Sequence, residues 1–99
     1  MVEIGKVTVD FGQMQAHQGK RSLNLTPKEF AMIRLLVEAR GRVVSREQFL
    51  DAVWGYGSFP TTRTVDNHVA GLRAKLEPDP NSPRYLLTIF GAGYRLELA

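Results

Sequence analysis

Residues 63–77 read RTVDNHVAGLRAKLE, and the spacing of the apolar side chains within them predicts an amphipathic helix. One narrow face of this helix carries Val65, Val69, Leu72 and Leu76. Thr62 is suited to cap its start, and Pro78 and Pro80 prevent its continuation because proline donates no backbone hydrogen bond. We therefore expect a helix with one buried face and one face turned away from the core.

The face opposite the apolar stripe is small and nearly uncharged. At about 100° per residue, it collects Arg63, Asn67, Ala70, Gly71 and Ala74. A glycine in a helix interior costs about 1 kcal/mol relative to alanine. A tight approach of the helix backbone to a partner at Gly71 would offset that cost. The alternative is that the cost is not offset by any contact.

Two further helices are predicted upstream, each with its own start signal. Thr26, Pro27 and Glu29 form the pattern of a capping box with proline at the first helical position, and Gly41 is a natural stop. The apolar face of this first helix carries Phe30, Ile33, Leu36 and Val37.

The second helix begins with Ser45 as its cap and Gln48 three residues later, and it ends at Gly55. Its apolar stripe carries Phe49, Leu50 and Val53. The following residues, 56–61, have the composition of a loop.

Strand patterns flank the helices on both sides. Residues 1–25 read as short strands of an antiparallel sheet with one solvated face, because Val7, Val9 and Phe11 alternate with polar residues. Residues 85–90 and 94–98 are rich in strand formers and flank a Gly-Ala-Gly turn. The sequence predicts one α+β domain over residues 1–99: a sheet over 1–25, three helices over 26–77 and a hairpin over 85–98. This arrangement is a winged helix-turn-helix.

Composition narrows the class of protein. The 99 residues carry a net charge of +3 and include no cysteine, which excludes disulfides and thiolate metal sites. Apolar runs are too short to span a bilayer, and the alternating N-terminus is unlike a signal peptide. We expect a soluble, cytoplasmic protein that needs no cofactor or metal and has no membrane partner. The mild basic excess favours an anionic partner without naming it.

Five segments carry a family resemblance, in order and with matching spacing: 25–30 (LTPKEF), 45–50 (SREQFL), 53–55 (VWG), 63–69 (RTVDNHV) and 91–95 (GAGYR). Together they resemble the OmpR/PhoB-type effector domain of bacterial two-component response regulators. The resemblance implies a winged helix with a four-stranded N-terminal sheet. It also implies sequence-specific binding to tandem promoter half-sites, as a tandem or homodimer. Activation would come from a phosphorylated receiver domain, for which this chain has no room. The resemblance implies transcription regulation rather than enzyme activity.

The resemblance also assigns DNA-binding positions. Those that usually touch phosphates are Trp54, Arg63, Thr64, His68, Arg73 and Tyr94, and Lys75 is added as a further cation. The helix over 63–77 stands where the family reads bases, here with Asn67, Ala70 and Gly71, and the wing carries Thr88, Phe90 and Gly91. The loop after the second helix resembles the segment that faces RNA polymerase in activators, with Tyr56, Ser58 and Phe59.

Three positions depart from the family. Ala70 and Gly71 replace arginines in the middle of the recognition helix, and Phe90 replaces an arginine before the wing-turn glycine. Phe90 has three interpretations. We rank a contact with a neighbouring protomer or domain first, packing back onto the wing second, and an apolar wedge in the minor groove third.

An alternative function follows from the missing arginines. The winged helix would then act mainly as a protein-interaction module, for dimerisation or polymerase contact, and salt-dependent binding to duplex DNA discriminates the two functions. An enzyme fragment has no convergent polar cluster to support it, since Asp66 and His68 fall on different helix faces. His17 has no metal-ligand spacing around it.

Overall fold

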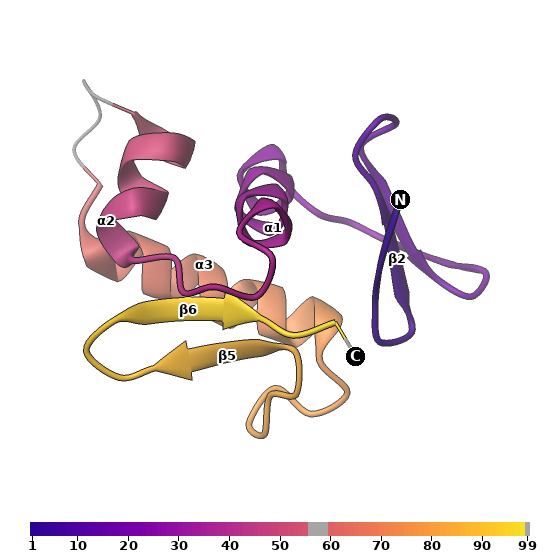
Figure 1. The fold of residues 1–99 in the computed structure, drawn as a ribbon. Coiled ribbons are helices and arrows are strands. Elements are labelled where there is room, and N and C mark those ends of the chain that lie inside the picture. The colour runs from indigo at the N-terminus through magenta and orange to yellow at the C-terminus, as the bar shows by residue number, and fades with distance from the viewer. Residues whose placement is uncertain (56–59, 99) are drawn as a thin grey trace.

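A sheet, three helical segments and a hairpin follow one another in the computed structural model, which describes residues 1–55 and 60–98 (Figure 1). The order is the one that the sequence predicts. α1 lies between the N-terminal sheet and α2, while the hairpin runs alongside α3 (Figure 1). The buried side chains of all these parts form one hydrophobic cluster, which places α3 and the hairpin on a single rigid core.

The N-terminal sheet contains β1 (Val2–Ile4), β2 (Val7–Asp10), β3 (Gln15–Gln18) and β4 (Arg21–Leu23), joined as an antiparallel meander. Val7 and Val9 are buried while Thr8 and Asp10 are half-buried, which confirms the predicted alternation. Phe11 falls just outside β2, in the turn that leads to β3. β1 completes the four-stranded sheet that the family resemblance implies, and its turn into β2 places Gly5 against the ring of Tyr85 near the wing.

α1 (Pro27–Glu38) begins with the predicted capping box. The amide of Glu29 donates to Thr26 Oγ1 over 3.2 Å, and the amide of Thr26 donates back to Glu29 Oε1 over 2.8 Å. The helix ends at Glu38 with Ala39 as its C-cap, before the predicted stop at Gly41, because Arg40 already turns to a positive φ of 53° and Gly41 follows at 83°.

The predicted second helix divides into α2 (Arg46–Phe49) and the π-helical segment η1 (Leu50–Trp54). Its capping box is confirmed, with the Gln48 amide 3.1 Å from Ser45 Oγ. The amide of Gly55 donates to the Leu50 carbonyl over 2.8 Å and closes the wider final turn.

α3 (Thr62–Leu76) begins and ends one residue earlier than predicted. Thr61 precedes it, and its carbonyl accepts a hydrogen bond from the Thr64 amide over 2.9 Å. The four residues of the predicted apolar stripe are buried, which confirms the helix register.

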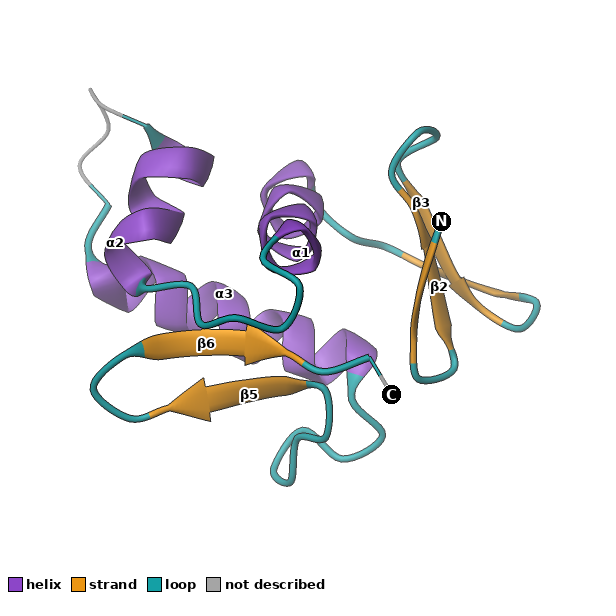
Figure 2. Ribbon diagram, in the orientation of Figure 1, coloured by secondary structure: helices purple, strands orange, loops and turns teal. Residues whose placement is uncertain are grey.

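The wing is the antiparallel hairpin of β5 (Leu86–Ile89) and β6 (Gly93–Leu96) (Figure 2). Val44, between α1 and α2, adds an isolated bridge on the other side of β6. The Val44 amide donates to the Tyr94 carbonyl over 2.7 Å, and the Tyr94 amide donates back over 3.0 Å. This bridge holds the base of the wing against the helices.

The described part of the chain contains neither a membrane-spanning helix nor a cluster of metal-binding side chains. No helix there is long and apolar enough to cross a membrane. Within the same residues, His, Asp and Glu side chains form no cluster suited to hold a metal ion.

Candidate nucleic-acid interface

The outward face of α3 is exposed to solvent beside the wing. Arg63, Asn67, Ala70 and Ala74 are exposed on it, as the helical wheel predicts. Gly71 is not part of this open face: it is half-buried, and a Cβ there would lie 3.5 Å from Glu29 Oε2 on α1. That distance is an ordinary van der Waals contact, so an alanine would also fit beside α1. The close approach of a partner to the backbone at Gly71 stays a prediction.

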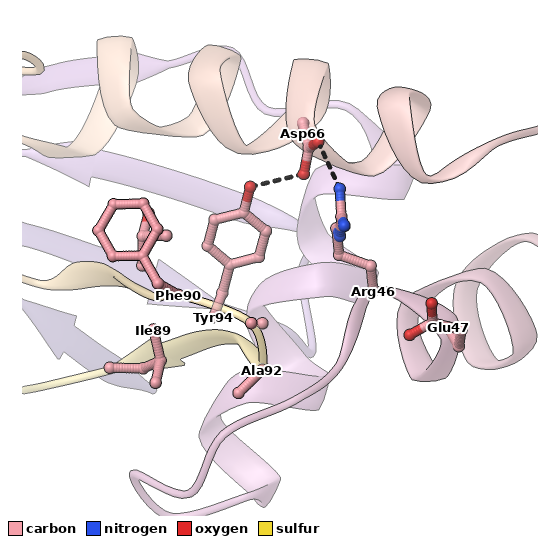
Figure 3. A pocket seen from close by; sticks show the side chains of 10 residues that line it. Arg46, Glu47, Asp66, Ile89, Phe90, Ala92 and Tyr94 are labelled. Carbon is pink, nitrogen blue, oxygen red and sulfur yellow. Dashed lines mark hydrogen bonds and ion pairs between the residues drawn. The ribbon is translucent and has the colours of Figure 1, made fainter.

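Asp66 joins three elements at the edge of α3. The Tyr94 hydroxyl on β6 donates to Asp66 Oδ1 over 2.6 Å, and Arg46 Nη1 on α2 donates to Asp66 Oδ2 over 3.0 Å (Figure 3). Neither Arg46 nor Asp66 was expected as a site residue. Their pairing spans 20 residues of chain, and no local pattern signals it.

Tyr94 is buried, and its hydroxyl is already engaged by Asp66 rather than free for a phosphate. Burial of the ring raises the pKa of Tyr94 to about 12, and the hydrogen bond to the Asp66 carboxylate and the negative charge of that carboxylate add to the increase. The neutral phenol is thus part of the fold across the whole ordinary pH range.

We expect alkaline pH to destabilise the chain through Tyr94. Because the folded pKa of about 12 exceeds the ordinary value of 10.0, the contribution of Tyr94 to stability is complete below pH 10 and is lost as pH rises toward 12. Urea denaturation across this interval should show that loss in the parent chain and in Tyr85→Phe, which keeps Tyr94. Tyr94→Phe should lack it. An unchanged pH profile in Tyr94→Phe would contradict the assignment.

Arg73 fastens the wing to α3. Its Nε and Nη2 atoms donate to the Leu86 carbonyl over 3.0 and 2.8 Å, and Nη2 also donates to Thr88 Oγ1 over 2.8 Å. The guanidinium lies 5.7 Å from the centre of the Tyr94 ring. The predicted phosphate contact would have to use the atoms of Arg73 that these bonds leave free.

Lys75 points toward α1 instead of the open face. Its Nζ atom lies 2.7 Å from Glu29 Oε1 and 2.8 Å from the Asn24 carbonyl, and Glu29 is buried. The lysine neutralises a carboxylate that the core would otherwise hold unpaired. This placement favours a structural role for Lys75 over the DNA contact that the resemblance implies.

Trp54 at the end of η1 and His68 in the first half of α3 form an aromatic pair. Their rings meet edge to face with centroids 5.0 Å apart, and His68 Nδ1 lies 2.9 Å from the Thr64 carbonyl. Lys28 lies 5.6 Å from the centre of the indole and donates to the Val53 carbonyl over 2.9 Å. The structure therefore brings Trp54, Thr64 and His68 together, near Arg63.

The wing tip borders an open groove of about 290 Å³ beside α3. The groove is lined by Arg46, Glu47, Asp66, Tyr94 and the hairpin residues 88–93 (Figure 3). Thr88 is exposed, and Gly91 takes a φ of 75° at the turn. Phe90 is 95% exposed, so packing back onto the wing is wrong.

Glu77 anchors the base of the wing and was not foreseen. It is buried, and its carboxylate accepts hydrogen bonds from the amides of Arg84, Tyr85 and Leu86 over 2.7 to 3.3 Å. The carboxylate thus sets where β5 begins relative to the end of α3.

The polymerase-facing residues Tyr56, Ser58 and Phe59 lie outside the described residues. Their assignment stays a prediction.

Proteins similar in sequence to this chain are transcriptional regulatory proteins. The family model for "Transcriptional regulatory protein, C terminal" matches residues 19–96. The alkaline phosphatase synthesis transcriptional regulatory protein SphR of Synechococcus elongatus is 45% identical over 76 residues, which make up 77% of this chain and 30% of SphR. The chain thus spans less than a third of that relative.

Solved structures share the fold. The response regulator DrrB of Thermotoga maritima, an OmpR/PhoB homologue, is 33% identical with a TM-score of 0.84, over 95% of this chain and 42% of DrrB. The DNA-binding domain of the response regulator AdeR, solved in complex with an intercistronic region, is 29% identical with a TM-score of 0.76. That match covers 96% of this chain and 97% of the AdeR domain.

Proposed function

This chain belongs to the OmpR/PhoB-type family of transcriptional regulatory domains, and we propose that it binds promoter DNA with α3 in the major groove and the wing beside it. The family consists of DNA-binding regulatory domains, not enzymes. The AdeR DNA-binding domain, solved in complex with an intercistronic region, supports DNA as the partner of this chain.

The observation that carries the proposal is the open face of α3. Asp66, Arg73 and Lys75 fasten the helix to the rest of the fold, whereas Arg63 and Asn67 make no hydrogen bond or ion pair within the described residues. The major groove is about 12 Å wide and admits one helix. A helix held at its sides with its outer face free has the shape that this groove requires.

In this proposal, uncharged side chains of α3 contact the edges of the bases. Asn67 has both a donor and an acceptor, which suits the N6 and N7 edge of adenine. Ala70 and Ala74 are exposed methyl groups that can pack against thymine methyls. Both contacts favour A·T pairs under α3.

Selection of bound sequences from random duplex DNA tests the function. We expect an enriched half-site that leans toward A·T, and Asn67→Ala should broaden the preference at one position of it. A consensus rich in guanine under α3 would contradict this reading of the helix. Failure to enrich any sequence would contradict the DNA-binding function itself.

Arg63 should supply phosphate neutralisation. Replacing it with alanine is expected to reduce the slope of log affinity against log salt by about 1, equally on selected and random duplexes. Arg34→Ala is the matched control, since Arg34 lies on α1 beside the N-terminal sheet and should leave the slope unchanged. Titrations at several salt concentrations measure both variants, and equal slopes for Arg63→Ala and the parent would refute the role.

Membership of this family supports further proposals about partners beyond DNA. We propose that a receiver domain elsewhere in the full protein controls this domain by phosphorylation, and that two copies occupy tandem half-sites. The loop before α3 would then face RNA polymerase.

A protein-interaction role is the second candidate, and the exposed ring of Phe90 favours it. Weak, salt-independent association with DNA together with self-association in solution would select that role over promoter binding.

A further inference from the structure

The wing tip presents one large apolar side chain to solvent. Phe90 follows β5 directly and is 95% exposed, while the neighbouring Leu86 is buried and Ile89 is half-buried. Gly91 has open space around its Cα. The ring is therefore held at the end of a rigid hairpin and has no packing partner among the described residues.

The ring lies on the side of the hairpin that belongs to α3. Thr88 lies on the face of β5 that is turned to α3, because its Oγ1 accepts a hydrogen bond from Arg73. Phe90, the first residue after β5, continues the strand's alternation onto this face. Figure 3 shows Phe90 and Tyr94 extending from the hairpin toward the helix, with Ile89 on the opposite side. Any duplex that receives α3 must therefore pass beside Phe90.

Electrostatic capture of the minor groove is weak at this tip. Around the groove and α3, Arg46 is paired with Asp66, Lys75 with Glu29, and Arg73 is bonded to β5. Arg63 is exposed on α3, and none of these described cations extends from the wing turn. A narrow minor groove attracts cationic side chains, which the turn at 90–92 does not offer. The side chain that this tip offers to a partner is the apolar ring of Phe90.

We propose that Phe90 enters the minor groove as an apolar wedge and selects a flexible pyrimidine–purine step at a fixed distance from the bases under α3. Such steps unstack and kink most easily, and phenylalanine is among the side chains that proteins insert between them. The inference rests on the proposed DNA binding by α3. It adds one position in the DNA site at which the protein discriminates by how easily the duplex bends. A stiff A-tract is the disfavoured sequence at that position.

The test uses the selected duplex in two versions, with either a TA step or an A-tract at the position that the wing covers. Phe90→Ala should bind the TA duplex about tenfold more weakly than the parent, with an unchanged salt slope because no charge is altered. Phe90→Leu should retain most of the affinity, since leucine also serves as a wedge. Phe90→Arg should reverse the preference toward the A-tract. Circular-permutation electrophoresis should show a bend that Phe90→Ala loses.

Met14→Ala is the control, because Met14 is also an exposed apolar residue but lies in the N-terminal sheet region, and it should change neither affinity nor bend. Equal affinity and bend for Phe90→Ala and the parent would overturn the wedge. If sedimentation then shows that Phe90→Ala has lost self-association, the ring covers a second copy of the chain. A parent chain that binds no selected duplex would overturn the proposed function as well, whereas a parent that binds normally isolates the failure to Phe90.

Discussion

Gly93→Ala is expected to lower the free energy of unfolding by about 3–5 kcal/mol, as the sum of backbone strain and overpacking. Gly93 has a φ of 143°, a conformation that is open to glycine and strained for other residues. A Cβ at this position would overlap the Val44 carbonyl and lie 2.8 Å from the Ser45 Cα. Both obstacles are backbone, so β6 would have to leave its bridge to Val44.

Gly91→Ala provides the matched comparison. Gly91 also has a positive φ, 75°, but nothing lies within 4 Å of an added Cβ. This variant should lose only about 1–2 kcal/mol, the cost of a left-handed conformation. Chemical denaturation of both variants measures the difference. Equal losses would show that the close approach of β6 to Val44 is absent in solution.

Glu77→Gln is expected to be the second most damaging change, at about 3 kcal/mol. The carboxylate accepts from three consecutive backbone amides, 84–86, and it is buried. An amide side chain keeps the shape but turns one acceptor into a donor that faces other donors. The remaining oxygen can still accept, but the amides that face the new NH2 group lose their acceptor. An amide left buried without a partner costs more than a lost surface hydrogen bond.

Urea denaturation and hydrogen exchange test Glu77 together. Exchange of the Tyr85 and Leu86 amides should accelerate in Glu77→Gln before the core amides of α3 do, because the wing base loosens first. Glu3→Gln removes an exposed carboxylate of the N-terminal sheet and should leave stability within about 0.5 kcal/mol. A Glu77→Gln chain as stable as Glu3→Gln would refute the anchor.

The helices were predictable because their signals are local. Thr26 with Glu29, and Ser45 with Gln48, form capping boxes that lie three residues apart in sequence and in space. The apolar period of α3 fixed its buried face in the same way. The ends shifted by a residue or two, where neighbouring turns compete for the last hydrogen bonds. The second helix also differs from the prediction, because it continues after Phe49 as the π-helical segment η1.

The polar connections were not predictable because their partners are remote. Lys75 meets Glu29 across 46 residues, and Tyr94 meets Asp66 across 28. A cation on a recognition helix and a tyrosine in a wing are each compatible with phosphate contact, and only the fold reveals that a carboxylate already holds them. The role of Glu77 was not predictable either, because its partners are backbone amides and no side-chain pattern marks them.

The division of α3 into fastened and free side chains affects how the protein can evolve. Arg63, Asn67, Ala70 and Ala74 project outward and contribute little to folding, so substitutions there should leave the folded population intact. Under the proposed reading of bases by α3, operator preference can drift or be engineered without first acquiring stabilising mutations elsewhere. A library randomised at these four positions would explore new promoters, because selection would act on recognition alone.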